Sequence, residues 1–245
     1  MALVAEHLPS ADDRLCESCG YRLNGLPDGA NCPECGAPAE DSISGASRKL
    51  PAWEVGRPGL RTWARTSLSV LLRPARFYRT LRTRADPAAS WWYALGHWSI
   101  ASLLLSWAAV LHGQWILRFY FTSRQPAWIL LAAGIVIGTL LIALFWQLSR
   151  LAALFTFWEG RYWGYRLPYP AVLRAIHYHA VHFLPVCAMG LLTVLTWRLG
   201  LREGWFDGIH ASNYLYLLSA EVILGAGYIF YTYTIAMRRI MYANV

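Results

Sequence analysis

Four long hydrophobic runs dominate the chain after residue 85. They are Ala94–Leu117, Ala127–Leu148, Ala171–Trp197 and Ser212–Ala236. A helix needs about 20 mainly apolar residues to cross the hydrocarbon core of a bilayer. The pattern therefore predicts an all-α fold, a polytopic bundle of four transmembrane helices. The apolar run Leu151–Trp158 is too short to span alone, so it extends the second helix, lies in the interface, or hides part of a fifth span.

Residues 58–84 show a different pattern. Apolar side chains recur there at intervals of three and four residues, and the pattern breaks at Pro74, which predicts two short helices. In the second helix Phe77, Tyr78 and Leu81 oppose three arginines. An apolar face opposite an arginine face is typical of a helix that lies in the lipid headgroup layer. A basic linker packed on the protein's own loops is the alternative.

The composition agrees with a membrane protein. Of the 245 residues, 56% are hydrophobic and 15% are charged, whereas a typical soluble domain carries about 25% charged residues. These values exclude a disordered chain, a collagen and a small disulfide scaffold. The sequence has no HExxH, GxSxG or P-loop motif. We therefore expect a protein that is not an enzyme.

The net charge of +8 is unevenly distributed. Residues 1–46 contain eight acidic and two basic residues, and residues 47–84 contain ten basic residues and one acidic residue. An acidic head argues against a nucleic acid partner, because phosphate binding needs bases. The basic block beside the first hydrophobic run favours anionic lipids. The chain divides accordingly into an acidic head (1–46), a basic linker with surface helices (47–84) and a transmembrane domain (85–245).

The basic residues also predict the orientation. Inner loops of membrane proteins carry an excess of Lys and Arg. With a cytoplasmic N-terminus, 18 of the 22 basic residues lie on the inner side, and only Arg118, Arg124, Arg198 and Arg202 lie outside. We expect an integral membrane protein, in the bacterial inner membrane, with both termini in the cytoplasm.

The head contains two CxxC motifs. Cys16 and Cys19 form the first, Cys32 and Cys35 form the second, and twelve residues separate them. Two such knuckles can bring four thiolates to one metal ion, and zinc takes this ligand set in structural sites. Disulfides are disfavoured in a reducing cytoplasm. We predict one structural zinc ion, and we interpret the fifth cysteine, Cys187, as a small residue of the transmembrane core.

Both knuckles resemble those of zinc ribbons, and they also resemble those of rubredoxins, which hold iron. The resemblance to rubredoxins is confined to the knuckles. An aromatic core and a longer segment between the knuckles are expected in a rubredoxin, and no aromatic residue lies between Arg22 and Asn31 in this chain. The zinc ribbon is the better match.

Glu221 lies inside the fourth hydrophobic run. A carboxylate in hydrocarbon has to be paired, protonated or directed into a cavity. The functional interpretations are a proton site or a substrate contact, and the alternative is a hydrogen bond between helices made by a neutral acid. Thr193 lies closer to Glu221 in depth than His182 does.

Three histidines, His177, His179 and His182, stand at the start of the third hydrophobic run. A metal or haem site is one interpretation. The repeated histidine boxes of membrane di-iron enzymes are absent from the sequence, and packing with hydrogen bonds near the interface is the favoured interpretation. In the second run Gly134 and Gly138 form a GxxxG motif, which serves either a homo-oligomer or packing within one chain.

Two segments resemble the Yip membrane protein family, the Rab/Ypt-GTPase-interacting proteins, and its bacterial relatives. They are Leu72–Leu81, with a proline followed by two aromatic residues and a leucine, and Tyr169–Tyr178, followed by Pro185. The resemblance implies a helical bundle with a cytoplasmic N-terminus, a role in membrane organisation and no catalytic residues. Family members usually have five spans, and four are predicted here.

Together these features predict a scaffold or adaptor in the membrane. Its zinc ribbon would dock a cytoplasmic protein while its arginine helices contact anionic lipids. Two alternatives remain. One is a redox protein with iron in the head and haem or quinone near the histidines, and the other is a small transporter that uses Glu221.

Overall fold

The computed structural model of the protein describes residues 13–27, 29–43, 48–55, 59–82, 85, 87–121, 125–163, 165, 168–205 and 211–244. The helices are α1 (Ala39–Ile43), α2 (Leu60–Leu72), α3 (Pro74–Thr80), α4 (Pro87–Phe121), α5 (Ala127–Tyr162), α6 (Tyr169–His179), the 3-10 turn η2 (Ala180–His182), α7 (Phe183–Arg202) and α8 (Ala211–Ile240). In the described residues the only other regular pairings are isolated bridges. The predicted all-α fold is confirmed. The predicted boundary at residues 46 and 47 lies outside the described residues.

Four helical segments are long and apolar enough to cross a membrane, which indicates an integral membrane protein. They are Pro87–Leu117, Ala127–Tyr162, Tyr169–Arg202 and Asn213–Ile240. Leu151–Trp158 belongs to α5, so this short run extends the second predicted span past Arg150. The segments α6, η2 and α7 share the third span, which the sequence predicted as one helix.

Pro185 accounts for the interruption of the third span. Proline has no N–H group with which to continue the hydrogen-bond ladder of α6, and its ring clashes with the carbonyl group of the fourth residue before it. In the first turn of a helix this N–H is not needed. A 3-10 turn therefore follows α6, and α7 begins at Phe183, which leaves Pro185 in its first turn.

The chain forms two compact units. One unit contains residues Ala94–Leu148 and Ala180–Tyr231, and the other collects Met1–Tyr93, Ser149–His179 and Thr232–Val245. We call the first the helical unit and the second the head unit. Each unit gathers segments that are distant in the sequence.

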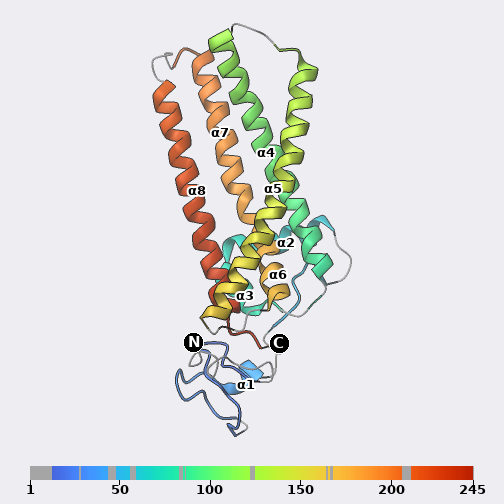
Figure 1. Ribbon diagram of the computed structural model, residues 1–245, viewed down its shortest axis with the longest axis vertical. Helices are drawn as coiled ribbons and strands as arrows, with labels where there is room; N and C mark the ends of the chain where they lie inside the picture. The colour runs from blue at the N-terminus through green and yellow to red at the C-terminus, as the bar shows by residue number, and fades with distance from the viewer. Residues whose placement is uncertain are drawn as a thin grey trace. The chain divides into compact units, whose positions relative to one another are not determined.

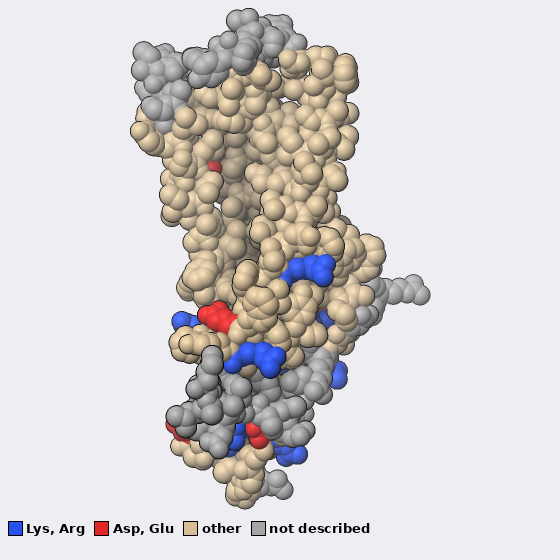
Figure 2. All heavy atoms as spheres, viewed as in Figure 1, with Lys and Arg blue, Asp and Glu red and all other residues tan. Residues whose placement is uncertain are grey.

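In the helical unit, parts of α4, α5, α7 and α8 run side by side (Figure 1). Trp98, Phe145 and Cys187 belong to one buried cluster, and Val194, Trp197 and Tyr214 contribute to a second. The interpretation of Cys187 as a core residue is confirmed. On the face shown in Figure 2, these helices present almost no Lys, Arg, Asp or Glu side chains. This surface suits contact with hydrocarbon.

The GxxxG motif of α5 faces α4 within this unit. A Cβ atom added to Gly138 would lie 3.5 Å from Oγ of Ser106, and one added to Gly134 would lie 3.8 Å from Cγ2 of Val110. Small residues at these positions allow the two helices to approach closely. The motif therefore serves packing within the chain, and the homo-oligomer stays a prediction that this contact does not address.

In the head unit, α2 and α3 separate at Pro74, which is the first residue of α3 as the sequence predicted. Phe77, Tyr78 and Leu81 are buried inside the unit, with Phe77 against Tyr178 of α6. The apolar face of α3 is thus covered by the protein itself. For this segment the structure agrees with the alternative interpretation, a basic linker packed on the protein. In α2, by contrast, the side chains of Leu60, Leu68 and Leu72 are exposed.

A buried ion pair joins α6 to the loop before α2. Nη2 of Arg174 lies 2.6 Å from Oε2 of Glu54, and both side chains are almost completely buried. The hydroxyl group of Tyr178 donates a hydrogen bond to the same carboxylate, and Nε of Arg174 donates to the carbonyl oxygen of Arg82 at 3.0 Å. Removing one partner of such a pair leaves an uncompensated charge, which costs more than the pair itself contributes.

We expect Glu54→Ala to lower the free energy of unfolding by about 3–5 kcal/mol, because the guanidinium group of Arg174 would stay buried without its carboxylate. Denaturation of the detergent-solubilised protein with SDS measures this change. The matched control is Glu203→Ala, which removes an exposed 3.7 Å contact with Arg202 and should change the free energy by at most about 1 kcal/mol. Equal losses in both variants would contradict the buried pair's role.

Candidate metal centre

Both cysteine knuckles have the same backbone hydrogen bonds. In the first, the N–H of Gly20 donates to the carbonyl oxygen of Cys16 at 2.8 Å, and in the second, Gly36 donates to Cys32 at 2.9 Å. Gly20 and Gly36 have φ angles of 84° and 71°. This left-handed region favours glycine, which explains the glycine after each CxxC motif. Each knuckle is closed by an isolated antiparallel bridge.

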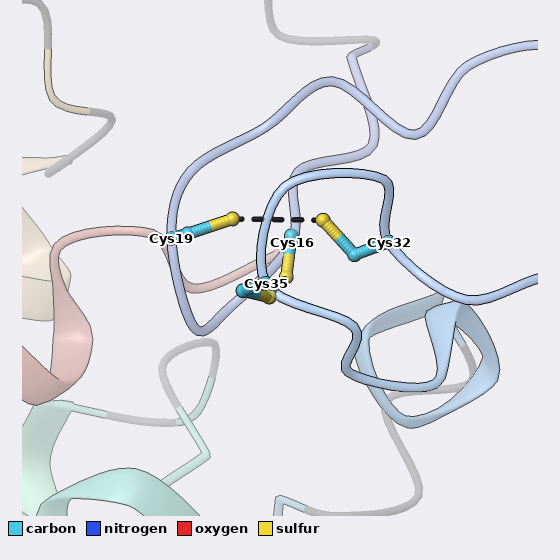
Figure 3. A group of neighbouring side chains, drawn as sticks. All are labelled: Cys16, Cys19, Cys32 and Cys35. Carbon is cyan, nitrogen blue, oxygen red and sulfur yellow. Dashed lines mark hydrogen bonds between the residues drawn. The ribbon is translucent and has the colours of Figure 1, made fainter.

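The four cysteine side chains point toward one another (Figure 3). The Sγ atoms of Cys16 and Cys35 are 3.5 Å apart, those of Cys19 and Cys32 are 3.6 Å apart, and all four lie within 4.8 Å of one another. Zn–S bonds of about 2.3 Å in a tetrahedral site place sulfur atoms about 3.8 Å apart. The geometry and the donor set therefore fit one zinc-sized ion. All four cysteines are free thiols.

Burial and backbone hydrogen bonds act in opposite directions on these thiols. Burial raises the pKa of Cys16 and of Cys19. The backbone N–H of Ala37 lowers the pKa of Cys35 to about 7. A metal ion binds cysteines in their thiolate form. Burial favours the protonated form of Cys16 and Cys19, so metal binding would have to displace these two protons.

The apolar core around the cysteines is small. Leu23 and Ala39 are its buried members besides Cys16 and Cys32, and Leu26 packs against them. A domain of this size rarely folds on apolar burial alone, so a bound metal ion would supply much of its folding free energy. In the described residues this cluster contains no aromatic side chain.

Contacts from the far end of the chain reach this centre, and sequence reasoning missed them. Tyr242 packs on Gly20, and Asn244 hydrogen-bonds to Leu15 and to Ser42. No spacing pattern connects residues 229 positions apart, so only the folded chain reveals them.

The carboxylate of Glu221 meets Thr193, the residue that depth matching indicated. The hydroxyl group of Thr193, on α7, donates a hydrogen bond to Oε1 of Glu221, on α8. Oε2 is buried and has no hydrogen-bond partner among the described residues. The helix-to-helix hydrogen bond expected from the sequence is present, and one carboxylate oxygen is not used by it.

The three histidines pair with three different hydroxyl groups. Nδ1 of His177 lies 3.1 Å from Oγ of Ser90, Nε2 of His179 lies 2.9 Å from Oγ1 of Thr232, and Nδ1 of His182 lies 2.7 Å from Oη of Tyr228. In the part of the chain that the structure describes, the four cysteines form the only group of three or more potential metal ligands. Hydrogen bonding and packing account for the histidines.

Comparison of the sequence with protein-family models found no matching family, and comparisons with curated proteins and with solved structures found no significant match. The resemblance to the Yip family therefore stays a prediction.

We expect the purified full-length protein to contain about one zinc and no iron per chain, because four thiolates close one tetrahedral site. Elemental analysis of the detergent-solubilised protein measures both metals. Cys32→Ser combined with Cys35→Ser should lose the zinc. Cys187→Ser is the matched control and should keep it, since Cys187 lies in the other unit. Iron near one per chain would overturn the zinc assignment and favour the redox protein.

Proposed function

We propose that this chain is a non-enzymatic scaffold or adaptor in the membrane, whose zinc-stabilised head docks a cytoplasmic protein. The cluster of Cys16, Cys19, Cys32 and Cys35 carries this proposal. A four-thiolate site has no open position for a substrate, and zinc has no redox chemistry, so a zinc ion held there acts on structure.

The head offers a groove for such a partner. Residues before the first knuckle, between the two knuckles and in α1 line a cavity of about 450 Å³. Among them are Arg14, Leu26, Pro27, Glu40 and Ile43. The lining mixes apolar side chains with polar groups, which suits an extended peptide segment. The excess of acidic residues in 1–46 favours a partner with basic residues, because complementary charge speeds association.

The remaining features support a function at a bilayer. The distribution of Lys and Arg supports cytoplasmic termini in a bacterial inner membrane. In α2 the exposed Leu60, Leu68 and Leu72 occur beside Arg61 and Arg65, a pairing that suits anionic lipid. The Yip-like segments support a role in membrane organisation without catalytic residues.

A photo-crosslinking amino acid at position 43 tests the docking groove in the full-length protein in cells. We expect one dominant adduct with a basic protein, because Ile43 is exposed at the edge of the groove. The adduct should disappear when Cys32 and Cys35 are both replaced by Ser, at an equal amount of membrane-inserted protein.

The matched control places the same amino acid at position 34, which is exposed on the second knuckle and does not line the groove. It should yield no dominant adduct. Equal adducts at both positions, or an adduct at position 43 that survives the double cysteine replacement, would contradict the adaptor.

A second candidate function is a small transporter, favoured by the buried Oε2 atom of Glu221, for which the described residues provide no hydrogen-bond partner. If the protein is such a transporter, we expect Glu221→Gln to abolish proton flux into proteoliposomes, because an amide cannot bind and release a proton. A pH-sensitive dye under an imposed membrane potential measures the flux. Glu203→Gln, at an exposed carboxylate after α7, is the control and should leave the flux unchanged. Equal flux with and without the Glu221 carboxylate would exclude the transporter.

A further inference from the structure

The segment that follows α8 binds to the first cysteine knuckle. Figure 3 shows this part of the chain, in faint red, beside the cysteine group. The side-chain amide of Asn244 pairs with both backbone groups of Leu15: Nδ2 donates to the carbonyl oxygen at 2.6 Å, and Oδ1 accepts from the N–H at 2.9 Å. One amide side chain thus occupies the hydrogen-bonding groups of the residue directly before Cys16, as a neighbouring β-strand would.

Asn244 also joins the knuckle to two other parts of the head unit. Its Nδ2 atom donates to the carbonyl oxygen of Ser42 at 2.7 Å, at the end of α1. Its backbone N–H donates to Oε1 of Glu17 at 3.1 Å, and this oxygen also accepts from Nε of Arg48 at 2.8 Å. Asn244 therefore lies where the first knuckle, α1 and the start of the basic segment meet.

Tyr242 makes the second contact with the same knuckle. A Cβ atom at Gly20 would come within 2.5 Å of Cε1 of Tyr242, so the ring packs directly on this glycine. Tyr165 packs edge-on against the ring of Tyr242, with 5.7 Å between the ring centroids. Gly20 therefore serves the turn through its positive φ and serves Tyr242 through its missing side chain.

The contacts of this segment with Leu15, Glu17 and Gly20 depend on the shape of residues 15–20. Cys16 and Cys19 are separated by two residues in this turn, and a metal ion that binds both sulfur atoms would hold the turn in place. Without a metal ion the small apolar core has little else to hold it. The groups that Asn244 and Tyr242 contact would then no longer be presented together.

We propose that residues 241–244 form a metal-dependent latch, which binds the first knuckle when the four-thiolate site is loaded and releases it when the metal ion is removed. The latch rests on the proposed zinc site. Because coupling between two binding events is reciprocal, a docked latch also raises the affinity of the four-thiolate site for the metal ion. The segment after α8 is then held to the first knuckle only in the metal-loaded protein.

Hydrogen–deuterium exchange of the full-length protein in nanodiscs, with zinc and after chelation, tests the latch. We expect the amides of residues 241–244 to exchange about tenfold faster or more after chelation, while those in the middle of α2 stay unchanged. Asn244→Ala should speed exchange of this segment with zinc present. Asn24→Ala is the matched control, because it removes an amide that bonds only to Arg14 and Asp13 within the described head, and it should preserve the protection.

Competition for zinc with a chromogenic chelator at equilibrium provides a second readout. Asn244→Ala keeps all four cysteines, so it should still bind one zinc, and its affinity for zinc should fall about fivefold or more. If the wild-type protein binds no zinc, the proposed function and the latch both fail. If zinc binds, but exchange of residues 241–244 is the same with and without it or the same in Asn244→Ala, the latch alone is overturned.

Discussion

Hydrocarbon offers no hydrogen-bond partner to a polypeptide, so the chain has to satisfy every backbone N–H and C=O group within a membrane by itself. This constraint explains why nearly all described residues of the helical unit belong to α4, α5, α7, α8 and the turn η2, with the exceptions at the ends of α5 and α7. The loops and bridges of the cysteine knuckles can exist only where water or protein replaces the lost helix bonds, and all of them belong to the head unit.

The same constraint decides how polar side chains occur in the helical unit. His112 pairs with Tyr214, His182 with Tyr228, and Glu221 with Thr193, so each of these three ionisable groups meets a hydroxyl group on a neighbouring helix. A hydroxyl group can donate or accept a hydrogen bond, so it can pair with an uncharged imidazole or carboxyl group, and no charge has to be buried. Glu221 differs from the histidines because a carboxyl group has two oxygen atoms and Thr193 uses only one of them.

The sequence was informative wherever a local pattern determines the structure. Apolar runs predicted the four spans, because the length of a helix in hydrocarbon follows from the thickness of the bilayer. The CxxC spacing predicted the four cysteines that the structure brings together. Periodicity marked the apolar face of α3 correctly but could not tell whether lipid or protein covers it, and Phe77 and Tyr78 are covered by protein. The contacts of Tyr242 and Asn244 had no local signal, because both depend on the path of the folded chain.

The small core of the cysteine head has a consequence for the rest of the head unit. Leu23 and Ala39 bury little apolar surface, so the cysteine head depends on contacts with other segments, and a metal ion bound to the four cysteines would add to its order. Arg48 and Asn244 both reach the knuckle through Glu17, which lies between Cys16 and Cys19. The carboxylate of Glu17 accepts from both and so ties the start of the basic segment and the end of α8 to one turn. A change in that turn cannot leave either segment unaffected.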